Sequence, residues 1–145
     1  MAEVKRMSLV KPTLKTHYHI DFDWWRKIDR DWRVYLQEYL CPQHQVIYEN
    51  VGVEEQFDFI DPNTAEVQRV DALQYVLISH CARQPDFTQG QTTLVDSIFR
   101  LFLANGNTPL TAVDMADQLG RQSAETILRT ISGIRIYKGI RPTQD

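Results

Sequence analysis

Two pairs of residues in this chain carry side chains that bind metal ions. Cys41 and His44 are three positions apart in the segment CPQH, and His80 and Cys81 are adjacent. Two sulfurs and two imidazole nitrogens suit a closed tetrahedral zinc site. Adjacent residues of a helix point about 100° apart, so His80 and Cys81 can both be ligands only if the helix before them has ended. The alternative is that the cysteines are small buried residues and the histidines ordinary core or surface residues.

A second string of metal-binding residue types is HYHIDFD, in which His17, His19 and Asp21 alternate. In an extended strand these three side chains point to one side, and the apolar residues between them point to the other. The string resembles part of a metallo-hydrolase signature but lacks the adjacent second histidine of that motif. We expect a polar strand face that leads into a helix.

The chain shows no motif that indicates catalysis. It contains no Gly-x-Ser-x-Gly nucleophile motif and no Walker-type phosphate loop. Its carboxylates are numerous, but none stands out as a pair in an apolar pocket. We therefore predict a protein that is not an enzyme.

Length and composition indicate one domain, or two small lobes that share a core, in 145 residues. The hydrophobic fraction of 43% is ample for a packed interior. No apolar run follows the basic N-terminus, and no stretch approaches the ~18 apolar residues that span a bilayer. Two cysteines do not form a disulfide framework. These features predict a cytoplasmic protein without a membrane partner.

Charge is distributed unevenly along the chain. The net charge of −3 argues against a strongly cationic, unselective nucleic-acid binder. From Arg121 onward, however, five basic residues stand against two acidic ones, a balance of +3. The C-terminal segment is therefore the part with which a polyanion would interact.

The segment from Leu110 to Gly133 predicts two short helices that meet at Gly120. In each helix the apolar residues recur at spacings of three and four, which places them on one face. Thr111 is a natural N-cap, and Asp114 three residues later completes a reciprocal capping pair. Gly120 can end the first helix in a left-handed conformation. Ser123 can then cap the second helix.

This segment resembles a winged helix-turn-helix, whose turn carries a small residue and a glycine four positions later, here Ala116 and Gly120. The resemblance covers roughly the last 50 residues. It implies that the second helix is a recognition helix and that IRIYKGIRP, at 134–142, forms a strand and wing. It also implies DNA as a partner, with Arg129 or Gln122 reading bases and the remaining cations on phosphates. The residues predicted to bind nucleic acid are Arg121, Gln122, Ser123, Thr126, Arg129, Arg135, Lys138 and Arg141.

Winged helices also serve as protein–protein adaptors, because the fold alone does not confer DNA binding. The net negative charge and the acidic residues on both helices, Asp114, Asp117 and Glu125, favour this second interpretation. The partner would then be another protein or a second copy of the chain, with structural zinc as a candidate stabilising cofactor.

The preceding residues predict a helical lobe with a β-hairpin. An apolar stripe indicates one long helix over 23–40, followed by a hairpin over 56–70 around the turn sequence DPNT and a helix over 71–83 that Asp71 caps. Thr92 or Thr93 should cap an almost wholly apolar helix that begins at Leu94. The stripe of the long helix consists of Trp25, Ile28, Trp32, Tyr35, Leu36 and Tyr39.

Together these elements predict a mainly α protein with a small β component. We expect a flexible arm over 1–16, a helical lobe with a hairpin over 17–90, and a winged-helix-like unit over 91–145 that packs on this lobe.

Overall fold

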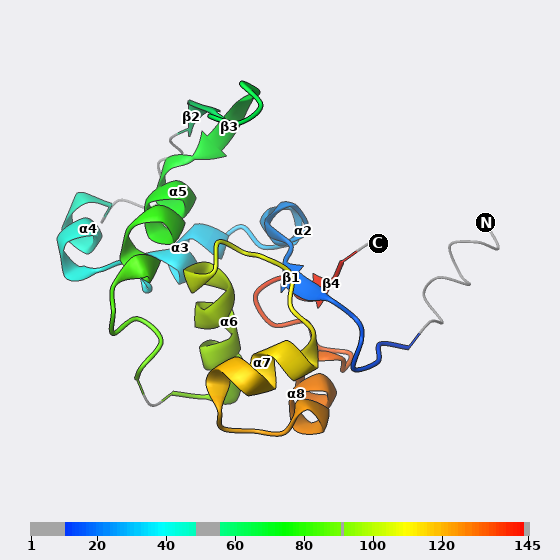
Figure 1. Cartoon of the computed structure of the whole chain (residues 1–145). Helices are drawn as coiled ribbons and strands as arrows, with labels where there is room; N and C mark the ends of the chain where they lie inside the picture. Colours follow the sequence, from blue (N-terminus) through cyan, green and yellow to red (C-terminus); the bar gives the residue numbers. More distant parts are fainter. Residues whose placement is uncertain (1–10, 49–55, 91, 144–145) are drawn as a thin grey trace. The chain divides into compact units, whose positions relative to one another are not determined.

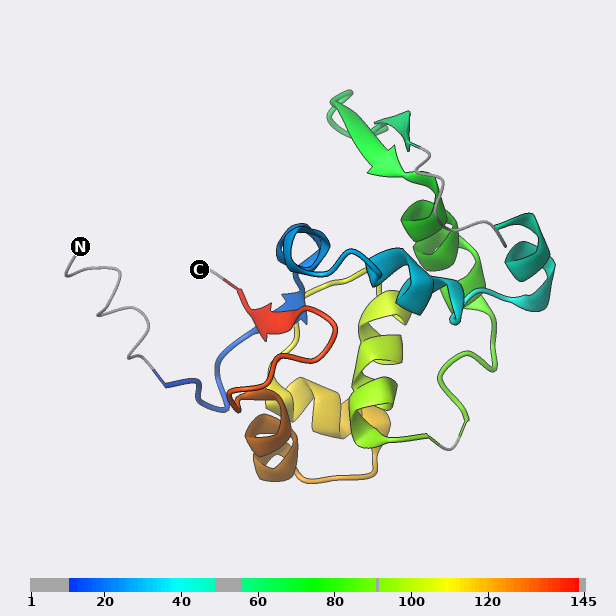
Figure 2. The same cartoon turned by 180° about the vertical axis from the view of Figure 1, so that it is seen from behind.

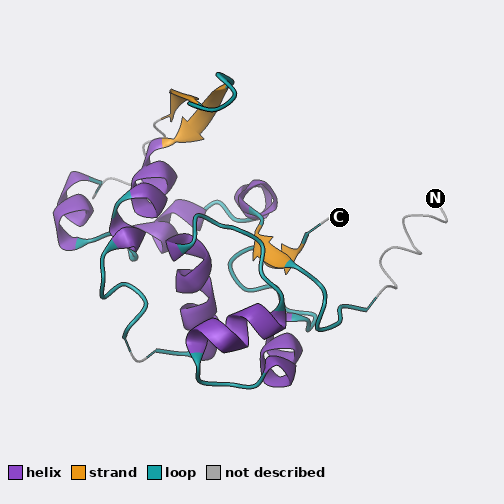
Figure 3. Cartoon of the chain, viewed as in Figure 1, coloured by secondary structure: helices purple, strands orange, loops and turns teal. Residues whose placement is uncertain are grey.

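The described residues are mainly helical with a small β component, as predicted, and they contain two antiparallel sheets of two strands each (Figure 3). The computed structural model describes residues 11–48, 56–90 and 92–143. These form two compact units. The N-terminal unit runs over 22–91 and 103–106, and the C-terminal unit over 1–21, 92–102 and 107–145, as far as these ranges are described (Figure 1). Among the helices described, none is long and apolar enough to cross a membrane.

The C-terminal unit contains the predicted pair of short helices, α7 (Ala112–Leu119) and α8 (Ala124–Ile131), which follow one another in Figure 1. Thr111 and Asp114 form the full capping box. Gly120 ends α7 with a φ of 65°, a left-handed conformation that costs glycine little. The Ser123 side chain caps α8 by accepting the N–H of Thr126. These predictions of local structure are confirmed.

Helix α6 (Leu94–Ala104) contributes residues to both units. The hydroxyl of Thr93 accepts the N–H of Asp96 at 3.2 Å, as expected of the N-cap. Ile98, Phe99 and Phe102 are fully buried, in agreement with the nearly continuous apolar sequence.

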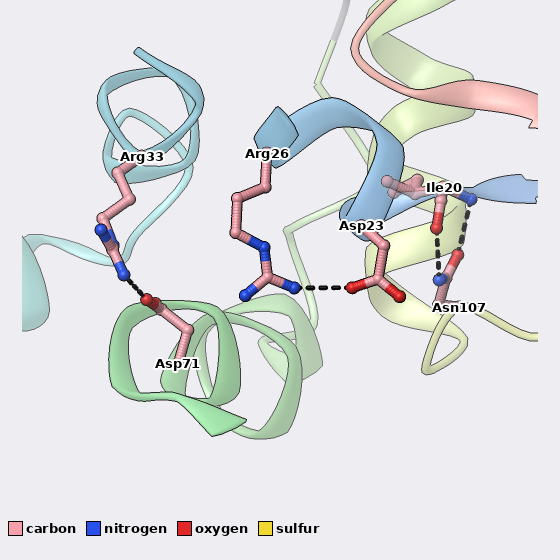
Figure 4. Close-up of polar contacts among 6 residues, drawn as sticks. All are labelled: Ile20, Asp23, Arg26, Arg33, Asp71 and Asn107. Carbon is pink, nitrogen blue, oxygen red and sulfur yellow. Dashed lines mark hydrogen bonds and ion pairs between the residues drawn. The ribbon is translucent and has the colours of Figure 1, made fainter. Parts of the chain in front are cut away.

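A short sheet joins distant parts of the C-terminal unit. Strand β1 (Tyr18–Ile20) pairs antiparallel with β4 (Ile140–Pro142), with His19 opposite Arg141 (Figure 2). Asn107 adds two bonds to this sheet, because its side chain accepts the N–H of Ile20 and donates to the Ile20 carbonyl, both at 2.8 Å (Figure 4). The amide of Asn107 therefore substitutes for a strand partner.

The strand predicted across 134–142 is confined to 140–142. Lys138 and Gly139 have φ values of 47° and 77°, and the Ile140 N–H donates to the Tyr137 carbonyl at 2.9 Å. This tight turn excludes an extended backbone directly before β4. The strand then pairs with the N-terminal β1.

In the N-terminal unit, the single helix predicted over 23–40 is wrong. The structure has two helices, α2 (Phe22–Ile28) and α3 (Trp32–Gln37). Between them the Asp29 carboxylate accepts the N–H of Asp31 at 2.9 Å, a local bond by which aspartate competes with helix continuation. The break also turns Ile28 and Tyr35 of the predicted apolar stripe toward solvent.

Trp25 and Trp32 of the stripe form an aromatic core with Phe22. The rings of Trp25 and Trp32 lie 6.2 Å apart, and each is within 6.5 Å of the Phe22 ring. Edge and tilted contacts of this kind stabilise aromatic clusters beyond the area they bury.

The hairpin follows the prediction closely, whereas the helix after it ends four residues earlier than the predicted 71–83. Strand β2 (Gln56–Ile60) pairs antiparallel with β3 (Val67–Asp71), and the Asp61 carboxylate accepts the Asn63 N–H inside the turn. Helix α5 (Ala72–Ser79) starts at once, and Asp71 caps it by accepting the N–H of Gln74. Asp71 also binds Arg33 in a buried ion pair (Figure 4).

Candidate metal centre

The first pair of predicted ligands lies at the start of a short helix. Helix α3 has already ended at Gln37, and Pro42 is the first residue of α4 (Pro42–Ile47). Proline suits this position because its fixed φ matches the helix and its missing N–H would have no partner there. Cys41 is the extended N-cap residue, and one turn of α4 carries His44 back to the same end.

The second pair lies where α5 has ended. The helix stops at Ser79, and His80 has φ and ψ of −127° and −62°, outside the helical region. Cys81 then begins η1 (Cys81–Arg83), a single turn of 3₁₀-helix. The condition for both residues to serve as ligands, that the helix has ended before them, is met.

Three of these side chains come together from the two places, and the fourth, Cys81, lies beside two of them. Ligand atoms of Cys41, His44 and His80 all lie within 4.8 Å of one another, close enough to hold a metal ion. The Cys81 sulfur lies 3.4 Å from the Cys41 sulfur and 3.6 Å from Nδ1 of His44. Cys41 Sγ is 3.1 Å from the same Nδ1, and the two imidazole rings are 4.7 Å apart.

The four residues differ in their exposure to solvent. Cys81 is buried, Cys41 and His44 are half-buried, and His80 is exposed. Burial raises the pKa of the Cys81 thiol to about 11, so without a metal this group is protonated at neutral pH. A metal ion that binds here must displace that proton, because the thiolate is the ligand.

The other string of metal-binding residue types does not assemble. Within the described ranges, Cys41, His44 and His80 are the one group of three or more His, Cys, Asp or Glu residues whose ligand atoms converge. Asp21 instead accepts a bond from Arg141 at 3.1 Å. Tyr18 and Ile20 are buried, so the strand does present a polar and an apolar face as expected.

The residues predicted to bind nucleic acid have different surroundings. Arg141 is bound to Asp21, and Arg121 donates to the Thr92 carbonyl and the Ser97 hydroxyl at 3.0 and 2.8 Å. Both arginines therefore bind within the C-terminal unit. Arg129 on α8 is exposed.

The remaining predicted residues have local roles or aromatic neighbours. Arg135 lies over the Tyr137 ring and Lys138 over the Phe99 ring, at 5.1 and 5.5 Å from the ring centroids. Gln122 is exposed, while Ser123 and Thr126 bond to each other as part of the α8 cap.

Sequence reasoning missed two arginine contacts. Arg33 binds Asp71. Arg121 binds residues at the start of α6. No local spacing signals either contact, since the partners are 38 and 24 residues away in sequence.

Comparison with known proteins identifies no relative: no family model, no curated protein and no solved structure matches the chain.

Proposed function

We propose that this chain is a non-enzymatic zinc protein whose N-terminal unit is stabilised by one Zn²⁺ bound to Cys41, His44, His80 and Cys81. The observation that carries the proposal is the convergence of Cys41, His44 and His80 from two places 36 or more residues apart. The Cys81 sulfur lies within 3.6 Å of the ligand atoms of two of them, Cys41 and His44. Two sulfurs and two imidazole nitrogens are the ligands that zinc prefers, whereas calcium and magnesium prefer oxygen.

The distances between these atoms support four ligands. Tetrahedral zinc, with bonds of about 2.3 Å to sulfur and about 2.0 Å to nitrogen, separates two sulfurs by about 3.8 Å and a sulfur from a nitrogen by about 3.5 Å. The separations from Cys81 Sγ are 3.4 Å to the Cys41 sulfur and 3.6 Å to the His44 nitrogen. Shifts of a few tenths of an ångström, together with rotation of the exposed His80 side chain, complete the site.

A site with four protein ligands is structural, because no position is left open for water or substrate. The ion would connect the start of α4 to the end of α5, two short helices in the same unit. Because the site forms only in the folded chain, the binding free energy of the ion adds to the stability of the folded state.

Metal analysis of protein purified without a histidine tag tests this proposal. We expect about one equivalent of zinc in the wild type, and a tenfold loss in affinity or more in Cys41→Ser and Cys81→Ser. His17→Asn is the matched control, because His17 is exposed and outside the cluster. Less than about a tenth of an equivalent in the wild type would contradict the proposal.

We further propose that the C-terminal unit binds a macromolecule, and that this partner is a protein. The fully exposed side chain of Ile134 supports a protein partner, as does Ile136, which is 39% exposed. The internal bonds of Arg121 and Arg141, with a net charge of −3, reduce the attraction for a polyanion.

DNA is the second candidate, favoured by one observation. Gln122 precedes α8 and Arg129 lies within it, and both side chains are exposed. Both residues follow the glycine turn that ends α7. In a winged helix-turn-helix these positions would face base edges, where arginine suits guanine and glutamine suits adenine. Arg135 and Lys138 would contact phosphates, so the logarithmic salt slope would be about −2 or shallower.

An electrophoretic shift assay at low salt with a random duplex separates the two candidates. Retardation that Arg129→Ala and the pair Arg135→Ala with Lys138→Ala both abolish would establish DNA binding and contradict the protein-partner proposal. Arg30→Ala is the control, because Arg30 is an exposed cation in the N-terminal unit. We expect no retardation at concentrations on the order of tens of micromolar.

A further inference from the structure

A cavity of about 350 Å³ in the N-terminal unit has no part in the proposed zinc site. It lies among α2, β3, α5 and η1, and each of three elements contributes one arginine to its lining: Arg26 from α2, Arg69 from β3 and Arg83 from η1. Small-molecule pockets typically measure roughly 300 to 1,000 Å³. The cavity is therefore large enough for a compact ligand, and its cations suggest the charge of that ligand.

The acidic residues of the lining offset these cations only weakly. Asp71 is already neutralised by Arg33, which is not part of the lining, and it accepts an N–H from α5 (Figure 4). Asp23 is bound to Arg26 at 2.6 Å, but its side chain is 80% exposed. Exposed pairs of this kind contribute little free energy, so an incoming anion can take the place of Asp23.

The other two arginines, Arg69 and Arg83, have weaker carboxylate contacts than Arg26. Arg69 lies 3.7 Å from Asp58, and both side chains are more than half exposed. Arg83 has no carboxylate partner in the described part of the chain. Guanidinium groups bind phosphate oxygens through two parallel hydrogen bonds, and three of them match the charge and the several oxygens of one phosphate group.

The rest of the lining is apolar and partly aromatic. Phe22, Val70 and Ile78 contribute carbon surface, and Tyr75 adds a ring held 5.7 Å from the Phe59 ring. Arg26 is itself held in place, since its guanidinium lies 5.6 Å from the centroid of the Trp32 ring. A flat ring can pack on this surface while a charged group attached to it reaches the arginines.

We propose that this cavity binds a small phosphomonoester whose alcohol part is aromatic. The arginines contact the phosphate, and Tyr75 with its apolar neighbours contacts the ring. This site is independent of the zinc proposal, because none of its lining residues is a proposed zinc ligand.

Calorimetric titration of the full chain with phenyl phosphate tests the inference. We expect saturable binding with a Kd below about 1 mM, at least tenfold weaker binding of inorganic phosphate, and no saturable binding of phenol. Arg83→Gln and Arg69→Gln should each weaken binding by about tenfold. Arg69 is mostly exposed on a hairpin, so its substitution leaves the fold intact.

Arg30→Gln is the matched control, because Arg30 is an exposed arginine outside the cavity lining. This variant should bind phenyl phosphate with the affinity of the wild type. An unchanged thermal midpoint identifies the variants that remain folded. Absence of saturable binding up to about 10 mM, or equal affinity in the wild type and in both cavity variants, would overturn the inference.

Discussion

Two helices of the N-terminal unit lack the side-chain caps that stabilise α7 and α8 of the C-terminal unit. In the C-terminal unit, α7 and α8 each have eight residues, a side-chain N-cap and fully buried side chains such as Met115 and Ile127. In the N-terminal unit, α3 and α4 have only six residues each, and neither receives a side-chain cap. No residue of α4 is buried.

This difference indicates where a metal would matter. Helices of six residues are unstable by themselves, since nucleation costs more than a few hydrogen bonds return. Helix α4 has neither a cap nor a buried face to compensate, yet it carries two of the four candidate ligands at its start. A bound ion would supply what burial does not, and we expect the C-terminal unit to need no such ion.

Removal of zinc should therefore have the largest effect, and it should act on one unit. We expect a chelator to lower the unfolding free energy of the N-terminal unit by roughly 3 kcal/mol or more. All three tryptophans, at positions 24, 25 and 32, lie in that unit, so their fluorescence reports on it alone. Amide hydrogen exchange of α7 and α8 is the internal control. An equal loss of amide protection in both units would contradict the claim that zinc stabilises the N-terminal unit alone.

Oxidation should produce a similar loss by another route. Because the chain has only two cysteines and their sulfurs lie 3.4 Å apart, hydrogen peroxide should join Cys41 to Cys81. The two thiolates give up two electrons, and the peroxide is reduced to water. We expect a disulfide in the mass spectrum and release of zinc in step with it. Cys81→Ser should form no intramolecular disulfide; zinc retained after complete oxidation would argue against the two sulfurs as ligands.

A smaller loss, confined to the C-terminal unit, should follow from Asn107→Gly. This change removes both side-chain bonds to Ile20 but tolerates the φ of 61°, and it should cost about 2 kcal/mol in denaturant unfolding. Asn107→Ala should cost more, because alanine is strained at that φ. If the two variants had equal unfolding free energies, the left-handed backbone at position 107 would not contribute to the loss of stability.

The smallest effect should come from Gly120→Ala. A Cβ at this position would meet no atom within 4 Å, so only the left-handed φ of 65° opposes it. We expect a loss of roughly 1 kcal/mol, seen in thermal unfolding of the C-terminal unit and not in tryptophan fluorescence. A loss several times larger would mean that the turn at Gly120 also supports packing.

Much of the local structure could be predicted because its causes are local. The capping box of Thr111 and Asp114 depends on residues three positions apart, and the turn at Asp61 depends on a bond to Asn63, two positions away. The metal-binding cluster could be predicted in part for the same reason. The two ligands of each pair are close in sequence, so only the contact between the two segments depends on the tertiary fold. The break at Asp29 was missed because aspartate is also tolerated on a helix surface, so its local bond to Asp31 leaves no distinct pattern.

The surroundings of the cations could not be predicted, because their partners come from remote parts of the sequence. Arg141 meets Asp21, which is 120 residues away, only because β4 pairs with β1. Likewise, the arginines that line the cavity lie at positions 26, 69 and 83, and no spacing in the sequence relates them.

X-ray absorption spectroscopy at the zinc edge tests the central claim most directly, because it reports the atoms bound to the ion. For the zinc-loaded full chain we predict two sulfurs at about 2.3 Å and two nitrogens at about 2.0 Å. Cys81→Ser should lose one of the sulfurs. A coordination shell of oxygen and nitrogen alone would contradict the account, since Cys41 and Cys81 would then take no part in binding.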